Sequence, residues 1–383
     1  MSTTLLSPVT GAALVAEGPD LLRDVDDRLW PQIDGIPYLR TGRDALVAEA
    51  ANRLRADDRD GALALLLADQ DDWWTGVKPG PDPLGRLIRH RDTLSLRDAM
   101  DLLGFDRVGH YFAHRWSDPT FLAGLALLEA HWRPTATAFE LACGIGHYGR
   151  DLLRRGVGFT GADVVFSKLW LARHWVLPPE AKLICFDAAS PWPIADQRFD
   201  LVFCHDAFYF LEPKATILDA LRGLAAPNGR LALSHIHNAE TDNLSAGRAM
   251  TADAVEAMFP QATVYDDAEL THALVEARPP RAAPIGTLRG VEAFSLEDAP
   301  LQPAQALAGG LATPPPSAAL RLNPLYRRED HGFAVTWPTP RYAAEYGGRA
   351  TYPLRWPAEA EVPDPQDSAA IRRRVFVDLP ERW

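Results

Sequence analysis

The chain has 383 residues and a formal net charge of −12 at pH 7, with 47% hydrophobic and 23% charged residues. This composition is that of an ordinary globular protein, and the length allows one large domain with extensions or two to three units. The negative charge argues against a tRNA, rRNA or DNA substrate, because affinity for nucleic acids comes largely from clustered Lys and Arg.

Cysteine usage and the absence of a targeting segment favour a cytoplasmic protein. Cys143, Cys185 and Cys204 show no zinc spacing, and their odd number argues against a disulfide framework. The first residues lack the charged start and the long apolar run of a signal peptide. No uninterrupted apolar run reaches about 18 residues, so we expect no membrane span.

The segment ahead of the core divides into two predicted units. Residues 1–42 alternate short apolar pieces with Pro and Gly, which is typical of a small β module. Residues 43–133 form a helical segment, because Leu and Ala recur three and four apart from Arg43 to about Asp72. A Pro- and Gly-rich loop is expected at Gly76–Leu84, before further helices.

Residues 135–163 combine a strand, a glycine turn, a helix and a second strand. The first apolar run ends at Gly144 and Gly146, and the second ends at Asp163. Such a unit binds adenosine-containing cofactors, because glycine lets the backbone approach the ligand and the helix N-terminus carries partial positive charge. A carboxylate at Asp163 can accept hydrogen bonds from both ribose hydroxyls.

The glycine spacing alone leaves two cofactors open. Gly144, Gly146 and Gly149 also satisfy the nicotinamide-dinucleotide fingerprint, so an oxidoreductase is one alternative. Glu140 argues against it, because a turn that binds pyrophosphate gains nothing from a further negative charge. Downstream, Asp187 follows a third apolar run, and RFDLVFC at residues 198–204 contains a fourth.

Taken together, these motifs resemble the class I S-adenosylmethionine-dependent methyltransferases over about Ala138–Ser234. The shared features are E-x-x-C-G-x-G, an acid closing the second strand, an acid after the third, and R-F-D-L-V-F-C. The resemblance implies a Rossmann-like α/β core at residues 134–298, with helices on both faces of a seven-stranded sheet ordered 3-2-1-4-5-7-6. It also implies S-adenosyl-L-methionine as cofactor and methyl transfer to an O or N atom of a small molecule.

The resemblance places the cofactor contacts at the carboxyl ends of the strands and in a segment ahead of the core. The core residues are Glu140, Cys143, Gly144, Gly146, Asp163, Val164, Asp187, Ala188 and His205. Ahead of the core, Tyr111 and Arg115 lie in a polar and aromatic cluster with His114. An arginine fork suits the methionine carboxylate, and an ordinary exposed helix start is an equal alternative.

Candidate catalytic residues follow the fourth and fifth strands. They are His205, Asp206, Tyr209 and His235. A histidine near its ordinary pKa is the natural general base at neutral pH, although a polar residue lining the sheet edge is an equal interpretation. His235 and His237 with Asp206 are a weak metal set without a firm further ligand, so we predict no metal.

The N-terminal module resembles the zinc-ribbon-like domain found beside many methyltransferases. It keeps the closing phrase P-x-I-D-G-I-P at residues 31–37, whereas Ser7 and Thr10 stand at the cysteine positions. A degenerate, metal-free module is therefore expected. Such modules often mediate pairing, so a catalytically inactive cofactor-binding scaffold or partner subunit, and a homo-oligomer, stay open as alternatives.

Residues 299–383 form a Pro- and aromatic-rich extension. Trp337, Tyr342, Tyr346, Tyr352 and Trp356 are too dense for a solvated tail, which is normally poor in aromatics. We expect this extension to pack on the core and to cover the strand ends near the glycine turn, together with the cluster around Tyr111.

Overall fold

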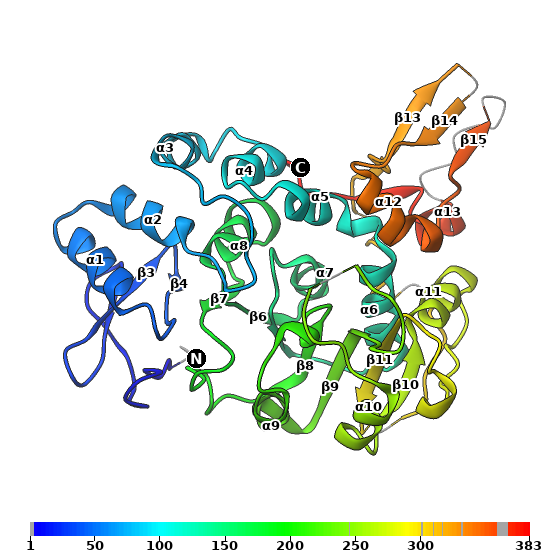
Figure 1. Ribbon diagram of the computed structural model, residues 1–383, viewed down its shortest axis with the longest axis horizontal. Helices are drawn as coiled ribbons and strands as arrows, with labels where there is room; N and C mark the ends of the chain where they lie inside the picture. The colour runs from blue at the N-terminus through cyan, green and yellow to red at the C-terminus, as the bar shows by residue number, and fades with distance from the viewer. Residues whose placement is uncertain are drawn as a thin grey trace.

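The computed structural model describes residues 4–244, 246–299, 302–308, 310–315, 317–330, 332–357 and 367–383. At its centre lies a seven-stranded sheet with the spatial order β10–β11–β9–β8–β5–β6–β7 (Figure 1). The strands are β5 (Thr137–Leu141), β6 (Gly158–Asp163), β7 (Lys182–Cys185), β8 (Phe199–His205), β9 (Ala225–His237), β10 (Thr263–Asp266) and β11 (Ala293–Asp298). Numbered along the core, this order is 3-2-1-4-5-7-6 read from β7, and the seventh strand, β11, is antiparallel to both neighbours. The predicted α/β fold and its strand order are therefore confirmed.

Helices cover both faces of this sheet (Figure 1). They are α6 (Pro119–Ala130), α7 (His147–Arg154), α8 (Phe166–Leu171, continued by a π-helical turn at Ala172–Val176), α9 (Lys214–Leu224), α10 (Ala252–Met258) and α11 (Asp267–Glu276). All of α6 is buried, because it packs against β9, β11 and α11. Helix α11 was not predicted from the sequence, and its first residue, Asp267, contacts His235.

The N-terminal module is a four-stranded antiparallel sheet that borders the central one. Its strands are β1 (Val15–Ala16), β2 (Leu21–Arg23), β3 (Leu29–Ile33) and β4 (Ile36–Pro37). Beyond β4, the Leu39 amide donates to the Cys185 carbonyl at 2.7 Å, and Tyr38 bridges Cys185 in parallel. The module thus covers the edge of β7, which would otherwise present unpaired backbone groups.

The positions that carry cysteine in a zinc ribbon serve as turn residues here. Ser7 Oγ donates to Asp24 Oδ2 at 3.1 Å and accepts from the Val9 and Thr10 amides at 3.3 Å. These hydrogen bonds stabilise the turn. The likeness of the module to a zinc ribbon stays a prediction.

A helical segment links the module to the core. Its helices are α1 (Asp44–Arg55), α2 (Arg59–Ala68), α3 (Pro81–His90), α4 (Leu96–Leu102) and α5 (Asp106–His114). The prediction of a loop at Gly76–Leu84 is wrong in its second half, because α3 begins at Pro81. Proline suits the first position of a helix, where its missing N–H is not needed.

A buried carboxylate joins the N-terminal module to α2. Asp69 Oδ2 accepts from the Tyr38 hydroxyl at 2.6 Å and from Arg40, and Asp69 Oδ1 accepts from Arg43 Nε at 3.2 Å. The side chains of Arg40 and Asp69 are both 5% exposed. A charge this deeply buried must be paired to be tolerated, so Asp69 fixes the module against the helices.

The described residues of the C-terminal extension form short strands and helices. Its elements are β12 (Leu320–Leu322), β13 (Tyr326–Glu329), β14 (Gly332–Val335), α12 (Pro340–Tyr346), β15 (Arg355–Pro357), α13 (Ser368–Arg372) and β16 (Phe376–Asp378). The strands β13, β14 and β15 form an antiparallel sheet that lies apart from the core in Figure 1. This small sheet has an apolar cluster of its own.

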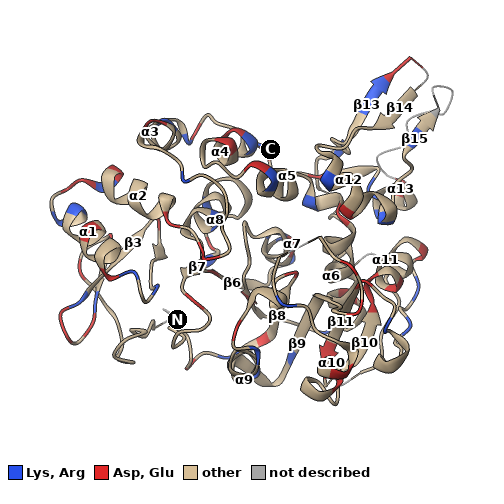
Figure 2. Ribbon diagram, in the orientation of Figure 1, with Lys and Arg blue, Asp and Glu red and all other residues tan. Residues whose placement is uncertain are grey.

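Charge and hydropathy add two general features. Lys and Arg are scattered over many elements rather than gathered on one (Figure 2). Within the described residues, no helix combines the length and the apolar character needed to cross a bilayer.

We predict that Asp69→Ala lowers the free energy of unfolding by about 3–5 kcal/mol, because it leaves buried positive charge without its partner. Asp72→Ala is the matched control, since Asp72 pairs with Arg43 from a side chain that is 93% exposed. The control should change stability by less than about 1 kcal/mol. Urea unfolding followed by circular dichroism measures both; equal midpoints for the two variants would contradict the assignment.

Candidate active site

The carboxyl ends of the parallel strands meet at one edge of the sheet, and the backbone there is strained. Ala142 and Asp206 directly follow β5 and β8, and His235 lies two residues before the end of β9; their φ values are +58°, +53° and +55°. A non-glycine residue in this left-handed region costs about 1–3 kcal/mol. Such residues persist where the surrounding structure holds them, and they cluster at functional sites.

Asp163 ties the glycine turn after β5 to the end of β6. Its Oδ2 accepts from the Gly144 amide at 3.0 Å, and its Oδ1 accepts from the Val165 amide at 2.9 Å. Gly144 and Gly146 have φ values of +56° and +82°, which glycine adopts without strain. Each carboxylate oxygen has a further lone pair, so Asp163 can support the turn and still accept from a ligand.

A lysine that the sequence analysis missed stands beside Asp163. Lys168 Nζ lies 3.6 Å from Asp163 Oδ1 and 3.9 Å from Asp71 Oδ2. Asp71 lies in the loop between α2 and α3, so this loop reaches the same edge of the sheet. The sequence did contain a signal for this residue: Lys168 is one of only a few lysines in the chain, and it follows the end of β6 by about one helical turn.

The remaining predicted cofactor residues lie along the same edge. Asp187 follows β7, is half-buried, and accepts from the Ala189 amide at 2.9 Å. Val164 is half-buried and Ala188 is buried. Cys143 is buried, and burial raises the pKa of its thiol; its role at the cofactor stays a prediction.

Glu140 carries an unpaired acceptor in the middle of the sheet. Its side chain is buried, and Oε2 has no hydrogen-bond partner among the described residues. Burial raises the pKa of this carboxyl group, and the nearby guanidinium of Arg115, which lowers the pKa, only partly offsets that effect. A buried orphan acceptor beside the glycine turn is suited to a cationic ligand group such as the ammonium of S-adenosylmethionine.

The structure brings Tyr111 and Arg115 onto Asp206. Asp206 Oδ2 accepts from the Tyr111 hydroxyl at 2.7 Å and from Arg115 NH1 at 2.9 Å, and Oδ1 accepts from the Tyr209 hydroxyl at 2.8 Å. The alternative of an exposed helix start is wrong, because Arg115 is 4% exposed. Burial alone would raise the pKa of Asp206, but His235, Arg115 and Tyr111 hold it below its ordinary value.

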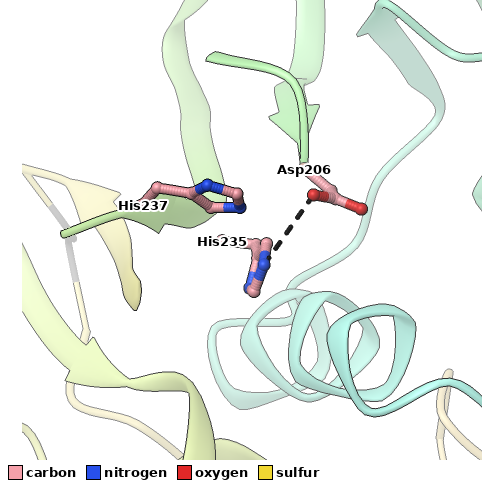
Figure 3. A group of neighbouring side chains, drawn as sticks. All are labelled: Asp206, His235 and His237. Atoms are coloured by element: carbon pink, nitrogen blue, oxygen red, sulfur yellow. Dashed lines mark ion pairs between the residues drawn. The ribbon is translucent and has the colours of Figure 1, made fainter. Parts of the chain in front are cut away.

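The two histidines of β9 face the same carboxylate (Figure 3). His235 Nε2 lies 3.9 Å from Asp206 Oδ1, which is too far for a hydrogen bond. The ring of His237 stacks on Tyr209 with centroids 3.9 Å apart, and burial and the neighbouring His235 lower its pKa to about 4. Asp206, Tyr209 and His235, all predicted from the sequence, therefore lie together.

His205, also predicted as a catalytic residue, makes apolar contacts rather than hydrogen bonds through its ring. Its ring packs against Tyr148 and Phe203, and neither ring nitrogen has a partner of normal geometry among the described residues. Burial and Arg115 lower its pKa to about 3. His205 is therefore neutral at physiological pH and lies on the side of the sheet that α7 covers.

Aromatic residues of two distant segments border this edge. Tyr346 stacks on Tyr111 with centroids 6.4 Å apart, and Tyr342 meets His114 edge-on at 6.0 Å. Trp73, in the loop after α2, packs against Phe210 with ring centroids 5.5 Å apart, and its side chain is 45% exposed. The other aromatics expected over the strand ends, Trp337, Tyr352 and Trp356, pack in the cluster of the small C-terminal sheet instead.

Within the described part of the chain, Asp206, His235 and His237 form a group that could hold a metal ion, with potential ligand atoms within 4.8 Å of one another. The geometry argues against this. Three donors already occupy the Asp206 carboxylate, and one of them is the Arg115 guanidinium, which would repel a divalent cation.

Comparison with known proteins identifies the central segment. Residues 139–233 match the family model described as a methyltransferase domain. No curated protein matches. Among solved structures, one similar protein is phosphoethanolamine N-methyltransferase 2 from Haemonchus contortus, in complex with phosphomonomethylethanolamine and S-adenosylhomocysteine. It is 16% identical to this chain, the match covers 48% of this chain and 49% of that protein, and the TM-score is 0.36. A TehB-like methyltransferase from Corynebacterium glutamicum is 18% identical over 46% and 85%, with a TM-score of 0.33. This chain thus spans about half the length of the Haemonchus protein.

We predict that the protein, stripped with EDTA and then dialysed against Zn²⁺ or Mn²⁺, retains no stoichiometric ion. The reason is the positive charge of Arg115 beside the only carboxylate of the group. Elemental analysis of wild-type protein and of His237→Ala provides the measurement. A stoichiometric ion that His237→Ala loses would contradict the prediction.

Proposed function

We propose that this chain, which contains an S-adenosylmethionine-dependent methyltransferase domain, transfers a methyl group to an oxygen or nitrogen atom of a small molecule. The observation that carries the proposal is the position of His235. Its imidazole lies at the same sheet edge as the glycine turn, beside the carboxylate of Asp206. The residues proposed to hold the cofactor and the proton-accepting imidazole thus lie at one edge of the same sheet, on β5, β6, β7 and β9.

The cofactor would be held by residues at the ends of β5, β6 and β7. The backbone at Gly144 and Gly146 would pass under the methionine part, with Glu140 near its ammonium. Asp163 would accept from the ribose hydroxyls, with the Lys168 ammonium 3.6 Å from its Oδ1. Asp187 would accept from the adenine amino group. When bound, S-adenosylmethionine supplies an electrophilic methyl group on a sulfonium.

The protein's own contribution is alignment and removal of a proton. Methyl transfer is an in-line displacement, so holding the acceptor in place supplies much of the acceleration. Burial alone would lower the pKa of His235, but the carboxylates of Asp206 and Asp267 raise it above its ordinary value. A histidine whose pKa is raised is a stronger base, and we assign the role of general base to the Nε2 of His235.

The acceptor side of the site has aromatic walls. Tyr209 and His237 stack beside Asp206, and Trp73 with Phe210 forms a partly exposed pair at the same edge. We assign the acceptor to the space next to these rings, because flat apolar surfaces with few polar groups suit small organic molecules. Tyr111 and Arg115 are assigned to the support of Asp206.

We predict that Asp163→Asn weakens S-adenosylmethionine binding by about 1–3 kcal/mol, because a charged acceptor of hydrogen bonds is lost. The amide oxygen can still accept from Gly144, whereas the amide nitrogen cannot accept from Val165, so one of the two hydrogen bonds that hold the turn is kept. Asp200→Asn is the control, because Asp200 accepts from the Ala136 and Thr137 amides where β5 begins. Calorimetry gives both affinities, and equal affinities would remove Asp163 from the site.

We predict that His235→Gln lowers turnover by about 10²–10⁴-fold on whichever compound of a metabolite panel proves to be methylated. Affinity for S-adenosylmethionine should be unchanged, since His235 lies on the acceptor side. His205→Gln is the control and should keep most of the turnover. Transfer of radiolabelled methyl provides the measurement; a His235→Gln enzyme as fast as wild type would refute the assignment of the base.

A further inference from the structure

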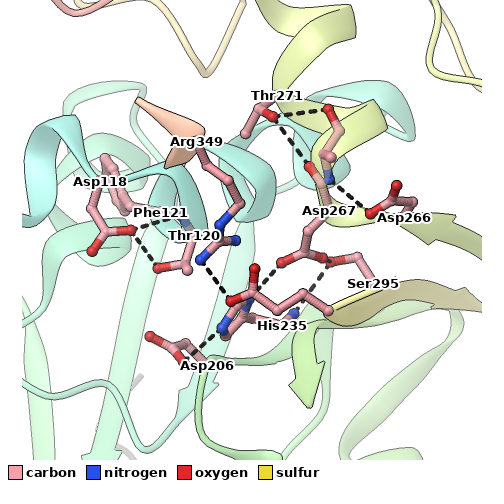
Figure 4. A network of polar contacts seen from close by, with 12 residues as sticks. Asp118, Thr120, Phe121, Asp206, His235, Asp266, Asp267, Thr271, Ser295 and Arg349 are labelled. Carbon is pink, nitrogen blue, oxygen red and sulfur yellow. Dashed lines mark hydrogen bonds and ion pairs between the residues drawn. The ribbon is translucent and has the colours of Figure 1, made fainter. Parts of the chain in front are cut away.

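A closed set of hydrogen bonds holds the far side of His235 (Figure 4). His235 Nδ1 lies 2.6 Å from Asp267 Oδ2, and the Ser295 hydroxyl donates to Asp267 Oδ1 at 2.5 Å. The same hydroxyl accepts from the His235 backbone amide at 3.2 Å. Ser295 is 0%, Asp267 2% and His235 4% exposed, so water does not compete for these bonds.

Each member of the set is placed by a distinct feature of the fold. Asp267 is the first residue of α11, directly after its capping residue Asp266. Ser295 lies where the pairing of β11 with β9 shifts register between Phe294 and Leu296. Such irregularities re-aim a side chain within a sheet. The left-handed backbone of His235 directs its ring between the two carboxylates.

We propose that Asp267 and Ser295 form a positioning pair that makes His235 Nε2 the proton acceptor for a hydroxyl group of the methyl acceptor. This inference rests on the proposed function. An ionised carboxylate at Nδ1 keeps the proton on that nitrogen, which leaves the lone pair on Nε2. Nε2 is also the nitrogen that faces Asp206 across 3.9 Å.

The surrounding charges are consistent with this assignment. Burial would raise the pKa of Asp267, but hydrogen bonds from His235 and Ser295 lower it, so Asp267 stays ionised. Arg349 acts on both groups from the C-terminal extension, where it pairs with Glu292 at 2.9 Å. The charged or titratable groups around His235 are thus Asp206 with its partner Arg115, Asp267, His237 and Arg349.

A base fixed in this way indicates an acceptor that must lose its proton to react. A neutral amine already presents a lone pair, whereas a hydroxyl becomes a strong nucleophile only as its proton leaves. The acceptor oxygen gives its proton to Nε2 and forms the bond to the methyl carbon. The electron pair of the carbon–sulfur bond leaves with sulfur, so charge and atoms balance. The acceptor class is therefore a small molecule with a hydroxyl group.

The test uses the full chain labelled with ¹⁵N in histidine and requires no acceptor. In wild type we expect the His235 resonances to show the proton on Nδ1 in the neutral ring. Asp267→Asn should lose that tautomer preference and lower the pKa of His235, because a negative charge is removed. Asp266→Asn removes the same charge one residue earlier and should leave the tautomer unchanged.

Ser295→Ala provides a second variant that keeps the charge of Asp267. It should weaken the tautomer preference without abolishing it, and it serves as the test should Asp267→Asn not fold. A wild-type neutral ring with its proton on Nε2 would overturn the proposal. So would an unchanged tautomer in the variants, or stoichiometric Zn²⁺ bound at His235.

Turnover separates this inference from the function on which it rests. With S-adenosylmethionine and a panel of hydroxyl and amine compounds, Asp267→Asn should lower kcat by about 10²–10⁴-fold with little change in KM. Methylation of amines alone, or full kcat in Asp267→Asn, would overturn the inference while methyl transfer stands. No transfer to any compound, with the predicted tautomer present, would overturn the proposed function instead.

Discussion

The buried carboxylate of Asp206 is the constraint on which the site depends. The side chain of Asp206 is only 7% exposed, and a charge buried this deeply is tolerated only where hydrogen-bond donors surround it. Here the donors come from separate parts of the chain. Tyr111 and Arg115 reach it from the helical segment, Tyr209 from the turn after β8, and His235 faces it from β9. Satisfying this one group therefore fixes the helical segment over the strand ends.

The C-terminal extension strengthens the same arrangement from outside. Tyr346 stacks on Tyr111, so α12 packs against the residues that hold Asp206. Farther along, Arg150 of α7 donates to both oxygens of Asp378 at 3.1 Å, and Trp383 Nε1 donates to the Ala113 carbonyl at 2.7 Å. The last residues thus tie α7 and α5 together, next to the glycine turn that they flank.

Local patterns were sufficient to predict the sheet and the turn. Apolar runs that end in glycine or aspartate mark strands and their carboxyl ends, and Gly144 and Gly146 adopt the left-handed conformation that such a turn requires. The residue types at the site could be named as well, since Asp206 and Tyr209 lie within four residues after β8 and His235 lies near the carboxyl end of β9. The core positions expected to contact the cofactor lie in or just after the strands of the central sheet, and their roles remain proposals.

The partners of these residues could not be predicted, because they depend on tertiary packing. Arg115 and Asp206 are 91 residues apart, so their ion pair has no local signal. Nothing in the sequence separates the buried Asp267 from its neighbour Asp266, which caps α11 at its surface. Ser295 acquires its role from a register shift that leaves no mark on the apolar pattern of β11.

The pH dependence of methyl transfer tests the central claim most directly. A proton can be accepted only by the neutral imidazole, and the pKa of His235 is raised. Turnover by wild-type protein should therefore increase with pH and level off above one ionisation that lies higher than the ordinary histidine pKa of about 6.5. In His235→Gln that ionisation should be absent. Turnover that is constant between about pH 5 and about pH 9, or a profile that His235→Gln shares, would contradict the account.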